Sequence, residues 1–190
     1  GSALAANTTG QNNVAIGRLS ATYNTTGGSN VAVGFNALNT NTTGTNNTAL
    51  GAAALDANTT ASNNTAVGQN SLSACTSGAS NVAVGTAAGM SLSTGTSLVA
   101  VGRDAAFSTT TGTGNTALGR SCLYTNQTGN YNIAIGQSSL QFNTASNNVA
   151  AGFESLKENT SAANNTAIGH QALKANTTGS SNTAVGANAL

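Results

Sequence analysis

The sequence predicts an all-β fold, a parallel β-solenoid (β-roll) of eleven coils in which each coil is one 17-residue repeat. Three observations favour this fold. A glycine that ends the phrase Asn-x-Ala-x-Gly returns every 17 residues, with one 16-residue step. The residues before that glycine alternate as they do in a β-strand. Only 5% of the residues are charged, against about 25% in ordinary globular domains.

The repeats cover residues 1–190, which predicts a single repeat array without a second domain. One coil buries too little apolar surface to fold without its neighbours, so residues 17 apart should lie directly above one another. The coils are anchored on Gly17, Gly34, Gly51, Gly68, Gly85, Gly102, Gly119, Gly136, Gly152, Gly169 and Gly186.

The segment before each glycine is the predicted strand. With that glycine as position 0, position −4 is Asn except at Leu98, and position −1 is Val, Ile or Leu except at Ala151. Position −3 is Val, Ile or Thr, and position −2 is always Ala. Side chains alternate along a strand, so positions −3 and −1 share one face, and Asn, Ala and Gly share the other. We expect the aliphatic −1 column in the coil interior and the Asn column as a ladder of side-chain amides.

The invariant alanine indicates a close neighbour that leaves room only for a methyl group. That neighbour is the far wall of a thin coil or a second chain. We expect the alanines to face a second chain in a homo-oligomer: Ala15, Ala32, Ala49, Ala66, Ala83, Ala100, Ala117, Ala134, Ala150, Ala167 and Ala184.

The segment after the glycine turns the chain back. Position +3 is small and position +4 is mostly Leu, so both should point inward, while charged and aromatic residues at +1, +2, +5 and +6 form a solvent-exposed ridge. Stacked strands repeat every ~4.8 Å, but packed helices need about 8–10 Å. We therefore expect a bent second strand or a tight turn rather than a helix, followed by an Asn-Thr-Thr-Gly turn that closes the coil. Off-pattern residues predict local irregularity at 86–107 and 137–152.

The composition argues against several functions. A net charge of +1 does not suit a nucleic-acid or anionic-membrane binder, and no apolar run reaches the ~20 residues that span a membrane. His170 is the only histidine, so we expect no metal, no cofactor and no enzyme activity. Cys75 and Cys122 should lie ~14 Å apart, too far for a disulfide, and should be structural.

Aromatic and cationic residues of the ridge are the candidate contacts for a ligand or partner. Phe and Tyr beside Arg can stack on sugar rings or contact a protein, although scattered exposed apolar residues are also ordinary. The candidates are Arg18, Tyr23, Phe35, Arg103, Phe107, Arg120, Tyr124, Phe153 and His170.

The phrases NNVAIG at 12–17, NVAVG at 30–34 and 81–85, and NIAIG at 132–136 resemble the head repeats of trimeric autotransporter adhesins (YadA-like). The longer form N-T-A-V-G-x-x-A-L with an N-T-T-G turn is similar to repeat shafts of bacteriophage tail fibres. These repeats are longer than those of the adhesins.

The adhesin resemblance implies a left-handed β-roll, three chains side by side and exposure on a cell surface. It also implies that Ala15, Ala32, Ala83 and Ala134 face the trimer, and that Val33, Val84 and Ile135 lie in the coil interior.

The predicted function is that of a structural fibre or shaft in an extracellular adhesin or a phage tail fibre, which holds a receptor-binding tip away from its base. Its partners would be copies of itself, as a trimer or an end-to-end filament, and a cell-surface glycan or protein receptor. A triple β-spiral is another geometry for the same role. The alternatives are a self-assembling extracellular filament and an ice-binding solenoid that uses the two Thr columns of the N-T-T turn, such as Thr25 and Thr26.

Overall fold

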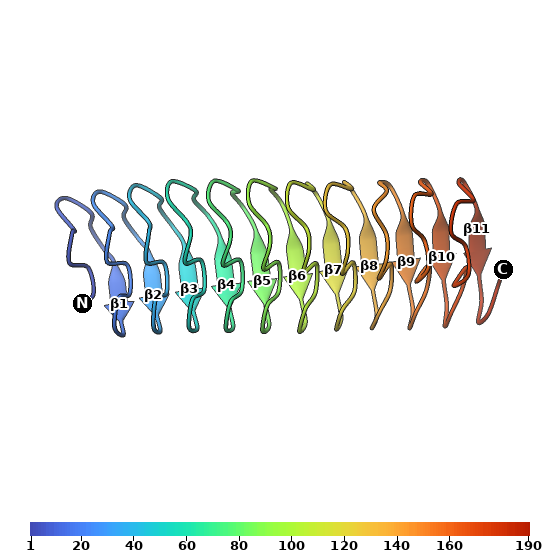
Figure 1. The fold of residues 1–190 in the computed structure, drawn as a ribbon, viewed down its shortest axis with the longest axis horizontal. Coiled ribbons are helices and arrows are strands. Elements are labelled where there is room, and N and C mark those ends of the chain that lie inside the picture. Colours follow the sequence, from blue (N-terminus) through green and yellow to red (C-terminus); the bar gives the residue numbers. More distant parts are fainter.

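The computed structural model describes residues 1–190 as a rod of stacked coils that follow one another in sequence order, with the termini at opposite ends (Figure 1). One strand per repeat joins a single parallel sheet in the order β1 to β11. Residues 17 apart pair directly, as Ala32 does with Ala49. This confirms the predicted β-solenoid. The strands are β1 Val14–Ile16, β2 Val31–Val33, β3 Thr48–Leu50, β4 Thr65–Val67, β5 Val82–Val84, β6 Val99–Val101, β7 Thr116–Leu118, β8 Ile133–Ile135, β9 Val149–Ala151, β10 Thr166–Ile168 and β11 Thr183–Val185.

Each strand ends at the repeat glycine because the chain turns there through a conformation that L side chains rarely adopt. Gly51, for example, has a φ of 138°. A Cβ atom at this position would lie 2.6 Å from the carbonyl oxygen of Gly68 in the next coil. Close stacking and positive φ therefore both require glycine at position 0.

The return segment is a tight turn, one of the two predicted alternatives, and the structure contains no helix. Residues at positions +2 and +4 adopt the left-handed backbone conformation, as Asn36 does with a φ of 57° and Leu38 with a φ of 53°. The peptide groups of this segment point along the rod, so that Leu38 N–H donates to Ala54 O at 2.9 Å in the next coil. Of 121 backbone hydrogen bonds, 101 lie outside the strands, so the ladder between coils runs around most of the perimeter.

The two faces of the strand are reversed relative to the sequence-based prediction. The −2 alanines point into the coil, where Ala32 has no exposed surface. The −1 residues point outward, and Ile16 and Ile135 are 60% and 42% exposed. The placement of Val33, Val84 and Ile135 in the coil interior is therefore wrong, because alternation puts the −1 side chain opposite the buried alanine.

The alanine column consequently faces the far wall of its own coil and not a second chain. Position +3 lies across the narrow interior, and Ser139 Oγ donates to the strand residue Ala150 O at 3.0 Å. That closeness leaves space only for a methyl group. The correction applies to Ala15, Ala32, Ala49, Ala66, Ala83, Ala100, Ala117, Ala134, Ala150, Ala167 and Ala184, which belong to the core or pack against it.

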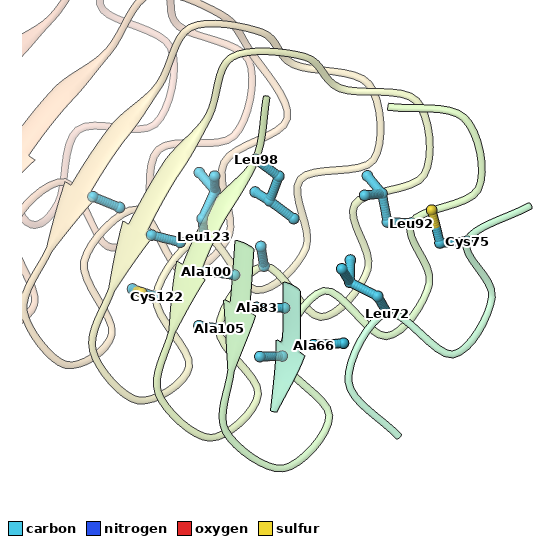
Figure 2. Close-up of a cluster of buried hydrophobic side chains, with 14 of the residues drawn as sticks. Ala66, Leu72, Cys75, Ala83, Leu92, Leu98, Ala100, Ala105, Cys122 and Leu123 are labelled. Atoms are coloured by element: carbon cyan, nitrogen blue, oxygen red, sulfur yellow. The ribbon is translucent and has the colours of Figure 1, made fainter. Parts of the chain in front are cut away.

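The leucines of position +4 form the apolar centre of the rod beside the alanine column. Leu38, Leu55 and Leu72 are fully buried. Figure 2 shows the +4 leucines Leu72 and Leu123, and the +3 residues Ala105 and Cys122, on the inside of the central coils. The predicted inward direction of positions +3 and +4 is confirmed.

The sheet shows no irregularity at either of the two segments where we predicted it. β5 pairs with β6, and β8 with β9, in the same register as elsewhere. The 16-residue coil omits one residue at its corner. There, Ala145 O accepts from Asn132 Nδ2 and Asn143 Nδ2, as the position +10 carbonyl does in 17-residue coils. The change is thus absorbed at the surface.

Candidate functional site

A ladder of buried asparagines at position −4 joins successive coils. Asn30 N–H donates to Asn13 Oδ1 at 2.9 Å, and Asn30 Nδ2 donates to Gly44 O, also at 2.9 Å. The predicted ladder is confirmed, except that the amide oxygen bonds the backbone N–H of the next asparagine rather than its side chain. Buried amides that lack partners are costly, so each asparagine fixes the position of the coil above it.

A second asparagine ladder, at position +7, was not predicted from the sequence. Asn41 Nδ2 donates to Asn24 Oδ1 at 2.7 Å and to Gly44 O at 3.0 Å. Asn58 Nδ2 in turn donates to Asn41 Oδ1 at 2.7 Å. The signal was present, because the first residue of the N-T-T-G turn recurs at Asn7, Asn24, Asn41, Asn58, Asn126, Asn143, Asn159 and Asn176.

Both cysteines are buried and free, at positions that face the coil interior. Cys75 stands in the second asparagine column and donates its S–H to Gly78 O at 3.2 Å. Burial raises the pKa of Cys75 to about 11 and that of Cys122 to about 12. Both thiols are therefore protonated at neutral pH and poor nucleophiles.

The nine ridge candidates do not converge on one site. Coils stack in sequence order, so Arg18 and Arg103, five coils apart, are separated by about 24 Å along the rod. The candidates fall into three groups: Arg18, Tyr23 and Phe35; Arg103, Phe107, Arg120 and Tyr124; Phe153 and His170.

Most aromatic candidates stack on the equivalent residue of the next coil. The rings of Phe107 and Tyr124 lie 5.0 Å apart and nearly parallel, and those of Phe153 and His170 lie 5.5 Å apart. The guanidinium of Arg18 lies over Phe35 at 5.1 Å. Each contact covers a ring face on which a sugar could otherwise stack. Each also joins two neighbouring coils and so stabilises their stacking.

The charged residues of the predicted solvent-exposed ridge include a cluster that is joined by ion pairs. Glu154 Oε1 pairs with Lys157 Nζ at 2.7 Å, and Glu154 Oε2 pairs with Lys174 Nζ at 2.6 Å. Gln171 Nε2 also donates to Glu154 Oε2. The bonds from Lys157 and then Lys174 lower the pKa of Glu154 to about 2. The cluster joins two coils and leaves little free charge for a ligand.

The two Thr columns of the N-T-T turn differ in the structure. Hydroxyls of the first column donate to the backbone of the next coil, as Thr25 Oγ1 does to Thr42 O at 2.9 Å. Side chains of the second column, such as Thr26 and Thr43, are exposed. Only one column therefore presents free hydroxyls.

The outward side of the sheet is a surface of uniform composition that extends from β1 to β11. Its side chains occupy positions −3 and −1 of every strand, and we call this surface the aliphatic face. All of them are Val, Ile, Leu, Ala or Thr, and none is charged. They are Val14, Ile16, Val31, Val33, Thr48, Leu50, Thr65, Val67, Val82, Val84, Val99, Val101, Thr116, Leu118, Ile133, Ile135, Val149, Ala151, Thr166, Ile168, Thr183 and Val185.

The surface of the rod has few hollows. It has one pocket, of about 320 Å³, lined by Leu173, Ala175, Asn176, Asn182 and Leu190, and none of the nine ridge candidates takes part. No three His, Cys, Asp or Glu side chains gather where they could hold a metal ion. The structure also has no helix of the length and apolarity that a membrane span requires.

Comparisons with protein-family models, curated proteins and solved structures found no match to this chain. Functional conclusions therefore rest on the rod, its ladders and its aliphatic face.

Proposed function

We propose that the chain is a structural shaft segment of an extracellular fibre, of the kind found in adhesins and phage tail fibres, that holds a receptor-binding tip away from its base. The observation that carries this proposal is the unbroken parallel register of the sheet, in which every strand pairs with the next from β1 to β11. A continuous ladder of this kind transmits load from coil to coil.

The internal ladders suit a mechanical role. At ~4.8 Å per coil, eleven coils extend about 53 Å. Separating two neighbouring coils breaks backbone bonds around the perimeter together with the two asparagine columns, as at Asn24 and Asn41. These bonds must break together, because all of them join the same two coils.

The proposal places the protein on a cell surface or virion, with other copies of the same chain as its first partners. The proposal includes the arrangement that the adhesin resemblance implies, which is a left-handed coil with three chains side by side. Receptor contact would come from the tip of the fibre and, on the ridge, from residues without a stacking or ion-pair partner. Tyr23, which is 57% exposed, and Arg120 are the candidates for contact with a glycan or protein.

Immunogold electron microscopy on the native source tests this function. Antibodies raised against the protein should label projections from the cell surface or virion at a fixed distance from the base. Label confined to the cell interior would overturn the shaft assignment.

Ice binding is the second candidate, and the exposed column of Thr26, Thr43 and Thr60 favours it. The first Thr column, whose hydroxyls bond to the backbone, contributes no free groups. We therefore rank this function below the shaft. A thermal-hysteresis measurement decides between them, because shaping of ice crystals by the protein would reverse the ranking.

A further inference from the structure

The aliphatic face is exposed or half-buried along the whole rod, although most of its residues are of types common in a protein core. Leu50 and Ile168 are 46% and 44% exposed, and Val84 in the middle of the rod is 36% exposed. β-branched and leucine side chains in this number are usually covered in soluble proteins. We therefore expect another surface of matching shape to cover the side chains of the aliphatic face.

The size of the face lies within the range of interaction surfaces. A strand of three residues is ~10 Å long, and eleven strands at ~4.8 Å extend about 53 Å, which gives about 500 Å² per chain. The largest apolar patch on a typical monomer is about 300–600 Å² and is often functional. Two such faces together would cover about 1,000 Å², the lower bound for a specific interface.

The chemistry of the face selects its partner. It contains no charged side chain and none of the Arg, Tyr or Trp residues that anchor most contacts with unrelated proteins. Its contours repeat once per coil, so only a surface with the same repeat can stay in contact along its full length. The aliphatic face of another copy has this repeat.

We propose that the aliphatic face packs against the aliphatic face of a second copy of this chain, sheet against sheet. Sheets that pack in this way interdigitate their side chains at a distance of about 10 Å. The inference rests on the proposed shaft function and deepens it, since it names the surface that joins copies of the chain. A contact of this kind joins two chains, so it takes the place of the three-chain arrangement that the adhesin resemblance implies. The aliphatic face thus takes the role that the sequence-based prediction gave to the alanine column, which lies inside the coil.

The first experiment compares two double variants by sedimentation velocity over a concentration series. Val67→Lys with Val84→Lys places two charges on the aliphatic face. The matched control, Gln69→Lys with Thr86→Lys, places the same charges on the ridge of the same two coils, where both residues are exposed. Like charges at an interface are strongly unfavourable, so the face variant should weaken self-association by about 100-fold or more. The control should associate as the unsubstituted protein does.

The second experiment identifies the contact directly. Val84→Cys should form disulfide-linked pairs on mild oxidation, and Thr86→Cys should not. The native thiols serve as the background, because Cys75 and Cys122 are buried and their pKa values are about 11 and about 12. Equal cross-linking of both variants would overturn the inference.

The two proposals fail in different ways. A monomer at all concentrations, with small-angle scattering of a rod about 53 Å long, would overturn the packing of aliphatic faces and leave the shaft intact. Scattering from a disordered chain would overturn both. An oligomer that the face variant does not weaken would show that the contact lies elsewhere and would also overturn the inference.

Discussion

Two regions of the rod have the same backbone but different interiors. In the first coils, Asn24, Asn41 and Asn58 continue the second ladder, and their amides bond from coil to coil. In the central coils the same column contains Cys75, Leu92 and Thr109, and Leu98 interrupts the first ladder. The central interior is therefore largely apolar, while the sheet keeps its register through both regions.

The difference shows that the asparagine ladders are not what defines the coil. Where the column changes, isolated polar atoms remain: Asn58 Oδ1 faces Cys75 and has no hydrogen-bond partner, and neither has Thr109 Oγ1. The fold tolerates these losses because the backbone ladder and the glycine and alanine columns continue. The ladders add stability and select one register.

The largest expected effect should be equal in both regions, because it concerns the shared glycine column. Gly51→Ala and Gly85→Ala each place a Cβ atom within about 3 Å of the next coil's backbone, at a φ near 130°. We expect each to cost more than about 4 kcal/mol and to prevent folding of the affected coils. Gly28→Ala is the control, because other coils carry Thr, Ser or Ala there. Thermal unfolding followed by circular dichroism measures the three variants, and a folded Gly51→Ala protein would contradict this account.

Substitutions in the second asparagine column should cost different amounts of stability in the two regions. Asn41→Ala leaves Asn24 Oδ1 and Asn58 Nδ2 without their partner, so we expect about 2–4 kcal/mol of destabilisation. Thr109→Ala changes the same column in the central region but removes a hydroxyl without a hydrogen bond, and should cost less than about 1 kcal/mol. Urea denaturation gives both free energies of unfolding. Equal costs would mean that the ladder contributes no more than packing does.

The sequence was sufficient to predict the solenoid, its register and the first asparagine ladder, because a 17-residue period with β-branched residues has few other solutions. It did not settle which face of the strand points inward. Alternation alone leaves both choices open, and the larger side chains of Val33 and Val84 favoured the wrong one. The deciding fact is the coil's thickness, which admits only alanine, and that depends on the left-handed turn at residues such as Leu38.

The candidate site was less predictable than the fold. The position of the ridge follows from the charged residues, but ring stacking between Phe107 and Tyr124 depends on side-chain geometry in neighbouring coils. The aliphatic face was not predicted, because the sequence-based prediction placed the −1 side chains inside the coil. A sequence pattern shows which residues share a face, and packing decides what that face contacts.

The central region also predicts a compensating pair. A Cβ atom at Gly89 would lie 3.0 Å from Leu72 Cδ2 and 3.1 Å from Leu98 Cδ2, so these leucines fill the space of the missing +4 side chain. Gly89→Leu should overpack the core and Leu98→Asn should open a cavity, each at about 1–3 kcal/mol.

The double variant restores the pattern of the other coils, where an asparagine at −4 meets a leucine at +4. The destabilisation of the double variant should be smaller than the sum of the two single destabilisations by at least about 1 kcal/mol. Denaturant unfolding of the four proteins completes the cycle. Strict additivity would show that the central leucines do not substitute for one another.

The smallest expected effect compares two carboxyl groups at different places on the rod. The lysines beside Glu154 lower its pKa to about 2, below the value in an unfolded chain, so the stability that it contributes is present at neutral pH and is lost as the pH falls from about 4.5 towards 2. Burial raises the pKa of Asp56, so the folded state gains stability as that group is protonated. Glu154→Gln should therefore lower the melting temperature slightly at pH 7 and have a smaller effect at pH 2, whereas Asp56→Asn should raise the melting temperature at pH 7. Calorimetric scans at pH 7, 4 and 2 test both signs, and a Glu154→Gln difference that is as large at pH 2 as at pH 7 would exclude the ion pairs as its cause.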